Sequence, residues 1–195
     1  MTSCKRSLIE SRITRVTNRT HHSYSVMADM EDALAVAVDK AVRNFFPKVK
    51  ELSCQQFEIM KSIFILQKDT FAVLPTGHGK SLPFQIAPFV AKELGPLKEF
   101  DFVKTKDIIL IIPPLLVIMD MQAKTLNSVG IPACCLHDES LDADEISSGE
   151  KFRVIFGTPE AWVKTDKWRN MLRSTMYQER VLLLVADEAH CVPEW

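Results

Sequence analysis

A glycine-rich loop directly after a short apolar run is the feature that most constrains how this chain can fold. Residues 70–74 are Thr-Phe-Ala-Val-Leu, and residues 75–81 are Pro-Thr-Gly-His-Gly-Lys-Ser. A strand that leads into such a loop and then into a helix is typical of a phosphate-binding site, because glycine lets backbone N–H groups turn toward an anion. The positive end of the following helix dipole adds to the attraction. The pattern therefore predicts an α/β domain that binds a nucleoside triphosphate.

The side chains of this loop supply the groups that a bound nucleotide needs. Lys80 offers a positive charge to the outer phosphates, and the hydroxyl of Ser81 can ligate Mg²⁺. The predicted ATP-binding residues of the loop are Thr76, Gly77, His78, Gly79, Lys80 and Ser81. The usual pattern has a glycine where this chain has Leu74, so the loop taken alone also fits a simple turn with an exposed lysine.

A second segment strengthens the nucleotide hypothesis. Residues 180–186, Arg-Val-Leu-Leu-Leu-Val-Ala, form an apolar run without alternation, as in a strand buried on both faces of a parallel sheet. Asp187 and Glu188 follow it, at the strand end where open α/β sheets bind ligands. We expect Asp187 to hold Mg²⁺, which prefers oxygen ligands, and Glu188 to polarise the attacking water. The alternative is that the two acids only cap a helix.

The two segments together resemble those of the superfamily 2 helicases. Residues 187–195, Asp-Glu-Ala-His-Cys-Val-Pro-Glu-Trp, are also similar to the start of the RecQ-type signature. The resemblance implies an ATP-dependent 3′-to-5′ DNA helicase that uses ATP and Mg²⁺. It also implies catalytic roles for Lys80, Glu188 and His190, the last of which would link the nucleotide to a domain interface.

Two further segments resemble parts of the same family that face nucleic acid. Residues 113–122 are similar to its Pro-Leu-x-x-Leu-Met-x-x-Gln segment, and residues 153–160 to its strand that ends in Thr-Pro-Glu. The resemblance implies contacts with single-stranded or partly duplex DNA by Pro114, Gln122, Thr158, Pro159, Glu160 and Trp195. Taken singly, the first segment also fits a proline that stops a strand, and the second fits a helix N-cap followed by an N1 proline.

Upstream of the loop, Gln56 lies at about the distance where the family carries a glutamine that reads adenine. The resemblance therefore implies an ATP-binding role for Gln56. The family has an arginine three residues earlier, where this chain has Ser53, and this departure puts adenine specificity in question. The alternative is a polar residue on an amphipathic helix over residues 54–66.

Hydrophobic periodicity predicts alternating helices and strands along most of the chain. The predicted helices cover residues 31–46, 54–66, 81–94, 115–129 and 160–177, and the predicted strands cover 70–74, 108–112, 133–136, 153–156 and 181–186. Strands that alternate with helices indicate a three-layer α/β domain with a parallel sheet, here of the RecA-like P-loop NTPase type.

The chain divides into three predicted parts. Residues 1–28 are rich in Ser, Thr and basic residues and are expected to be a disordered leader, with a true start at Met27 as an alternative. Residues 29–50 are predicted to form an amphipathic helix and a linker, and residues 51–195 the first RecA-like ATP-binding domain of a helicase.

In the family, a Ser-Ala-Thr strand follows the Asp-Glu-Ala-His segment and lies beside the phosphate-loop strand. A second α/β domain then supplies arginines to the γ-phosphate. The sequence ends at Trp195, so we expect a truncated first domain with little hydrolysis of its own. The alternatives are a non-catalytic nucleotide-binding or dominant-negative interaction module, and a DEAH-type RNA helicase, against which residues 191–195 argue.

Composition is that of a globular domain, with 47% hydrophobic residues, 25% charged residues and a net charge of −1. Near-zero net charge gives no support to DNA binding. No apolar stretch approaches the roughly 20 residues that span a bilayer, and the five cysteines show neither a disulfide framework nor a metal-binding spacing. We expect an intracellular protein located in the nucleus, with the mitochondrion as the alternative.

Overall fold

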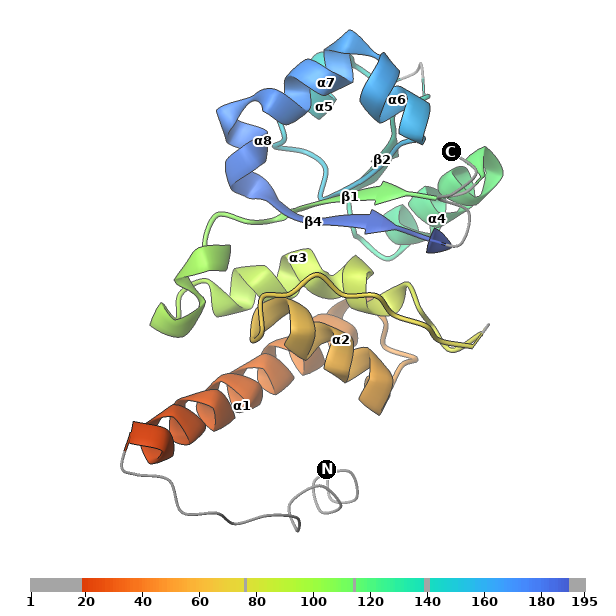
Figure 1. Cartoon of the computed structure of the whole chain (residues 1–195). Helices are drawn as coiled ribbons and strands as arrows, with labels where there is room; N and C mark the ends of the chain where they lie inside the picture. The colour runs from red at the N-terminus through yellow and green to blue at the C-terminus, as the bar shows by residue number, and fades with distance from the viewer. Residues whose placement is uncertain (1–18, 76, 114, 139–140, 190–195) are drawn as a thin grey trace.

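Four parallel strands form the centre of the molecule. The computed structural model describes residues 19–75, 77–113, 115–138 and 141–189. The sheet has the order β2-β3-β1-β4 (Figure 1), with all neighbouring strands parallel. The strands are β1 (Ile108–Ile112), β2 (Ala133–Cys135), β3 (Val154–Phe156) and β4 (Val181–Ala186). Because parallel strands end at the same edge of a sheet, the residues that follow them lie together there. The predicted α/β fold is confirmed.

One face of the sheet is covered by the helices from the first part of the chain. Ile109 and Ile111 of β1 and Phe156 of β3 point into this core. Figure 1 shows α3 next to the sheet and α1 beyond α3, on the same face of the sheet. The rings of Phe45 on α1 and Phe89 on α3 pack together, with 4.1 Å between their centroids. The helices of this face are α1 (Arg19–Phe45), α2 (Cys54–Phe64), α3 (Leu82–Leu94) and α4 (Leu116–Ser128).

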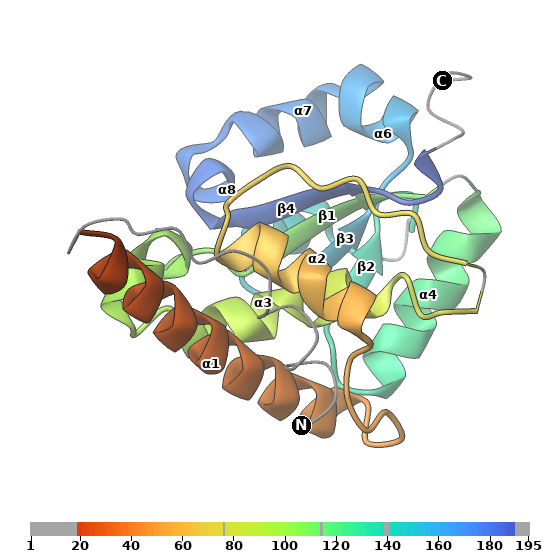
Figure 2. The same cartoon turned by 60° about the horizontal axis from the view of Figure 1, so that its bottom comes forward.

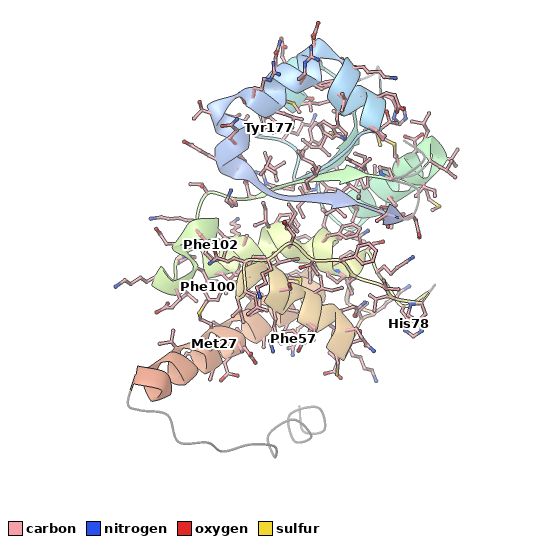
Figure 3. All side chains as sticks on the ribbon, viewed as in Figure 1. Met27, Phe57, His78, Phe100, Phe102 and Tyr177 are labelled. Carbon is pink, nitrogen blue, oxygen red and sulfur yellow. The ribbon has the colours of Figure 1, made fainter. Side chains whose placement is uncertain are left out.

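The opposite face is covered by shorter helices. The alternate residues Ile108, Leu110 and Ile155 point to this side, as the two-residue period of a strand requires. Tyr177 is fully buried here (Figure 3), and its hydroxyl donates to the carbonyl of Ile146. These helices are α5 (Ala143–Ser147), α6 (Pro159–Lys164), α7 (Asp166–Arg173) and α8 (Thr175–Arg180), and a 3₁₀ helix, η1 (Lys98–Val103), precedes β1.

The prediction of one helix over residues 160–177 is wrong, because this stretch is divided into α6, α7 and α8. Thr158, Thr165 and Ser174 each have extended backbone and begin a new helix. The Thr158 hydroxyl accepts from the N–H of Ala161 at 3.1 Å, and the Ser174 hydroxyl accepts from the N–H of Tyr177 at 3.4 Å. Hydroxyl side chains favour such N-cap positions over helix interiors, which explains the breaks.

The first helix is longer than predicted. It begins at Arg19, so residues 19–28 are helical although they fell in the predicted leader, and residues 1–18 lie outside the described residues. No proline or glycine interrupts residues 19–45, and the helix therefore extends past the part that packs on the core. Fully buried contacts begin at Leu34, whereas Met27 remains exposed (Figure 3).

The prediction of a strand over residues 70–74 is also wrong. This segment pairs with none of the described strands, and it is drawn as an irregular trace in Figures 1 and 2. Phe71 is 80% exposed and Val73 is 79% exposed. A strand needs a neighbouring strand with which it forms hydrogen bonds, and residues 70–74 form none with β4, the edge strand of the described sheet. Leu184 of β4 is 66% exposed. The segment therefore leads into the phosphate loop from outside the sheet.

Within the described residues, no helix combines the length and the apolar character needed to cross a bilayer.

Candidate nucleotide-binding site

The glycine-rich loop has the backbone of an anion-binding turn. Gly77 has a φ of +82° and Gly79 a φ of +64°, in the left-handed region that favours glycine. The N–H of His78 donates to the carbonyl of Pro75 at 3.2 Å, which closes the turn. Helix α3 begins immediately after Ser81, so the positive end of its dipole lies at the end of the loop, although the N–H of Leu82 already donates to the carbonyl of Gly79 at 3.1 Å and Pro83 has no N–H. This arrangement fits a phosphate group.

Gln56 braces this loop from α2. Its side-chain Nε2 donates to the carbonyls of His78 at 3.0 Å and Gly79 at 2.9 Å, while its Oε1 accepts from the N–H of Ser53 at 2.8 Å. Ser53 caps α2 in return, since its hydroxyl accepts from the N–H of Gln56 at 3.2 Å. The Gln56 side chain is buried, and a Cβ at position 79 would lie 2.8 Å from its Nε2. The structure thus brings Gln56 to the loop, while a contact with adenine stays a prediction.

Lys80 joins the loop to the end of β4. Its Nζ lies 2.8 Å from Oε1 of Glu188, and both side chains are about one-third exposed, at 31% and 36%. The hydrogen bond to Glu188 raises the pKa of Lys80, and the negative charge of Asp187 adds to this effect. Lys80 is therefore a cation at neutral pH. Glu188 has a φ of +54°, an uncommon backbone conformation that recurs at functional sites.

Asp187 is held at the carboxyl end of β4 by its neighbours. Its N–H donates to the carbonyl of Ile112 at 2.9 Å, which continues the β1–β4 ladder by one residue. One carboxylate oxygen accepts from the N–H of Glu188 at 3.1 Å, and the other lies 3.4 Å from Nε2 of Gln122. The Oε1 of Gln122 is buried and has no hydrogen-bond partner among the described residues.

These groups fit a magnesium ion. Ser81 follows Lys80 and Asp187 precedes Glu188, so the Lys80–Glu188 contact brings together the two segments that carry the predicted ligands. The Ser81 hydroxyl makes no capping hydrogen bond to α3, and the Gln122 amide that contacts Asp187 through Nε2 also carries a buried oxygen without a hydrogen-bond partner among the described residues. Carboxylate, hydroxyl and amide oxygens are the ligands that Mg²⁺ takes.

The two predicted nucleic-acid segments meet in one groove of about 440 Å³. It is lined by Pro113, Leu115, Leu116, Val117, Thr158, Pro159 and Glu160. Thr158 is the N-cap of α6 and Pro159 lies in its first turn. The alternative prediction for this segment, a helix N-cap followed by an N1 proline, is therefore confirmed. Gln122 does not line the groove, because its side chain contacts Asp187 instead.

A family model described as "DEAD/DEAH box helicase" matches residues 53–195. The chain belongs to this helicase family. Among its relatives, "ATP-dependent DNA helicase Q1" of Mus musculus is 26% identical over 84% of this chain and 26% of the relative. "ATP-dependent DNA helicase RecQ" of Synechocystis is 26% identical over 67% of this chain and 25% of the relative. "Bifunctional 3'-5' exonuclease/ATP-dependent helicase WRN" of Mus musculus is 28% identical over 76% of this chain and 10% of the relative.

These relatives confirm the resemblance of this DEAD/DEAH box domain to RecQ-type helicases. The chain spans between a tenth and about a quarter of their length. Four predicted site residues of the domain lie outside the described residues, namely Thr76, Pro114, His190 and Trp195. His78 is exposed at the outer tip of the phosphate loop (Figure 3), away from the sheet.

Sequence reasoning missed two features of this helicase domain. The first is the link between Ser53 and Gln56, for which the Ser-x-x-Gln spacing of a capping box was the available signal. The second is a cluster of Asp120, Cys135 and His137, which spacing along the chain does not indicate because Asp120 comes from a different element. Burial, together with Asp120, raises the pKa of the Cys135 thiol to about 12, as expected of a buried cysteine.

Proposed function

We propose that this chain is the ATP-binding part of an ATP-dependent 3′-to-5′ DNA helicase of the RecQ type. The observation that carries the proposal is the 2.8 Å contact between Lys80 and Glu188, which joins the phosphate loop to the acids at the end of β4. A nucleoside triphosphatase needs these two groups on either side of the outer phosphates. The names of the RecQ-type relatives support DNA as the nucleic acid.

Nucleotide binding would change the contact partners of Lys80 and Glu188 in this site. Lys80 would leave Glu188 and bind the outer phosphates, because a phosphate carries more negative charge than one carboxylate. Glu188 would then accept a hydrogen bond from the attacking water and orient it. Ser81 and Asp187 would hold Mg²⁺, which when bound neutralises phosphate charge.

Gln56 would have to exchange a contact in order to read adenine. A glutamine amide has two N–H hydrogens, and Gln56 directs its Nε2 at the carbonyls of His78 and Gly79. An adenine acceptor would replace one of these carbonyls. Adenine binding and the shape of the phosphate loop are therefore coupled through this single side chain.

The groove between α4 and α6 is the proposed contact with DNA. Leucine, valine and proline side chains dominate its lining, and Glu160 is its charged member. Apolar groups suit the flat faces of unstacked bases better than phosphates, so we expect this groove to contact bases of a single strand. Gln122, Pro114 and Trp195 remain proposed DNA contacts of the same domain. DNA as a partner favours the nucleus as the location, with the mitochondrion as the alternative.

A second candidate is a module that binds ATP without hydrolysing it. The segment before the phosphate loop lies outside the sheet, and this favours a loop that is less rigidly held than hydrolysis requires. In the helicases that the chain resembles, hydrolysis also uses arginines of a second α/β domain. We therefore expect the chain by itself to bind ATP and to hydrolyse little of it. DNA-stimulated phosphate release that Lys80→Ala abolishes would contradict this expectation.

Titration of the chain with a fluorescent ATP analogue in the presence of Mg²⁺ tests the proposal directly. We expect Lys80→Ala to weaken binding by about tenfold or more, since it removes a charge-assisted contact with phosphate. Lys92→Ala is the matched control, because Lys92 is exposed on α3, the helix that follows the loop, and its loss changes the net charge equally. Equal affinities for the two variants, each with an unchanged unfolding temperature, would overturn the proposed nucleotide site.

A further inference from the structure

Three side chains that can ligate a metal meet at the edge of the sheet opposite β4. Asp120 lies on α4, Cys135 is the last residue of β2, and His137 follows two residues later. Nε2 of His137 is 3.1 Å from a carboxylate oxygen of Asp120. One ligand atom from each residue lies within 4.8 Å of the other two. The nucleotide and DNA contacts described above use none of the three.

The backbone holds this cluster in place independently of any bound ion. The side chain of Asn127 makes two hydrogen bonds of 2.9 Å with the N–H and carbonyl of Ala133, and these fix α4 to the start of β2. The N–H of Asp138 donates to the carbonyl of Cys135 at 3.1 Å, which turns the chain back after the strand. The ligand atoms therefore come from a helix, a strand and a closed turn, and little further ordering is needed to bind an ion.

The chemistry of the set selects a particular kind of cation. A sulfur, an imidazole nitrogen and a carboxylate oxygen suit zinc and similar divalent metals, whereas Mg²⁺ and Ca²⁺ prefer oxygen ligands alone. With bond lengths of about 2.0 to 2.3 Å, ligand atoms on a tetrahedral zinc are roughly 3.2 to 3.8 Å apart. The observed limit of 4.8 Å is about 1 Å wider than this range, so binding an ion requires the ligand atoms to move closer together. The Cys135 side chain is buried, whereas that of His137 is 37% exposed, so the outer side of the cluster is open to water.

We propose that Asp120, Cys135 and His137 form a binding site for Zn²⁺, with water as the fourth ligand. The bound ion ties α4 to the end of β2. Because Asp120 and Gln122 both lie on α4, the bound ion would help to position Gln122 next to Asp187, although the ion itself is not part of the candidate nucleotide site. The site is independent of the proposed helicase function and would stand if that function failed.

Cobalt titration of the metal-free chain tests this site, because Co²⁺ in a tetrahedral thiolate site absorbs strongly in the visible and near ultraviolet. We expect one Co²⁺ per chain, a thiolate charge-transfer band and displacement of the cobalt by Zn²⁺. Cys135→Ser should remove the charge-transfer band, and His137→Asn should weaken binding by roughly tenfold or more. Zn²⁺ should also raise the unfolding temperature of the unaltered chain and not that of His137→Asn.

A matched variant tests for binding elsewhere. Cys54→Ser removes an exposed cysteine on α2, so this variant should bind Co²⁺ like the unaltered chain. Cys135 is buried and its replacement can disturb folding, whereas the side chain of His137 is more than one-third exposed and its variant keeps the test valid. No thiolate band in the unaltered chain, or an undiminished affinity in His137→Asn, would overturn the proposal.

Discussion

At the scale of single residues, the phosphate loop depends on two glycines that differ in what surrounds them. Gly77 and Gly79 both have left-handed backbone. A Cβ at Gly77 would meet no atom within 4 Å, whereas a Cβ at Gly79 would lie 2.8 Å from Nε2 of Gln56. Position 77 therefore requires glycine for its backbone alone, and position 79 requires it for both backbone and space.

We accordingly expect Gly79→Ala to be more harmful than Gly77→Ala. Each substitution places alanine in the left-handed region at a cost of about 1 to 2 kcal/mol, and Gly79→Ala also displaces the Gln56 amide from two carbonyls. Thermal unfolding and nucleotide titration of the two variants measure the difference. Identical unfolding temperatures would show that Gln56 does not hold the loop.

At the scale of elements, one carboxylate joins the beginnings of β1 and β4. Asp107 accepts from Nε of Arg180 at 2.8 Å and from its Nη2 at 2.7 Å, and Nε of Arg153 lies 3.4 Å away. The side chains of Asp107 and Arg180 are 28% and 21% exposed, so solvent screens this pair only partly. Such two-bond pairs have a fixed geometry, and this one joins the last residue of α8 to the residue that precedes β1.

Asp107→Asn should reduce the free energy of unfolding by about 1 to 2 kcal/mol, because an amide cannot accept both guanidinium bonds. In a domain of this size, each kcal/mol corresponds to roughly 2 to 4 °C in unfolding temperature. Asp101→Asn is the control, because Asp101 is exposed on η1. If both variants unfolded at the same temperature, the Asp107–Arg180 pair would not stabilise the fold as expected.

The elements also show where sequence reasoning succeeded. Unbroken apolar runs located β1 and β4 with their observed bounds. The predicted burial on both faces is wrong for β4, because β4 lies at the edge of the described sheet and its residues are partly or largely exposed, whereas β1 lies between two strands and is buried. The same reasoning failed for residues 70–74, because a suitable composition does not provide the neighbouring strand that pairing needs. The helix over residues 160–177 failed for a local reason, since hydroxyl residues inside an apolar pattern can begin new helices.

For the candidate site, the sequence predicted which segments come together, but it did not predict all of the side-chain contacts. The motifs indicated that Lys80 and the acids after β4 belong to one site, and the structure brings Lys80 and Glu188 together. The contacts of Gln122 with Asp187 and of Gln56 with the loop were not predictable. They depend on the direction in which a side chain leaves a distant helix, which spacing along the chain does not specify.

At the scale of the whole molecule, the sheet has an open edge beside the segment that carries the phosphate loop. The described residues form a sheet with β4 at its edge, and residues 70–74 lie outside it. Large apolar side chains are exposed there, among them Phe71 and Leu184. The stability of the described fold should therefore come from the layers around β1 and β3 and not from this segment.

A matched pair of phenylalanine substitutions tests this division. Phe71→Ala should change the free energy of unfolding by less than about 0.5 kcal/mol, because the side chain is 80% exposed. Phe64→Ala should cost about 3 to 5 kcal/mol, because Phe64 is fully buried on α2. Chemical denaturation of both variants gives the comparison. A loss of several kcal/mol in Phe71→Ala would mean that residues 70–74 pack into the sheet after all.

The amide of Gln56 belongs to two structures at once, the first turn of α2 and the underside of the phosphate loop. Natural variation at this position cannot alter one without altering the other. In the proposed nucleotide site, a substitution here would therefore change folding and nucleotide affinity together. We expect position 56 to tolerate fewer substitutions than the exposed positions of the same helix.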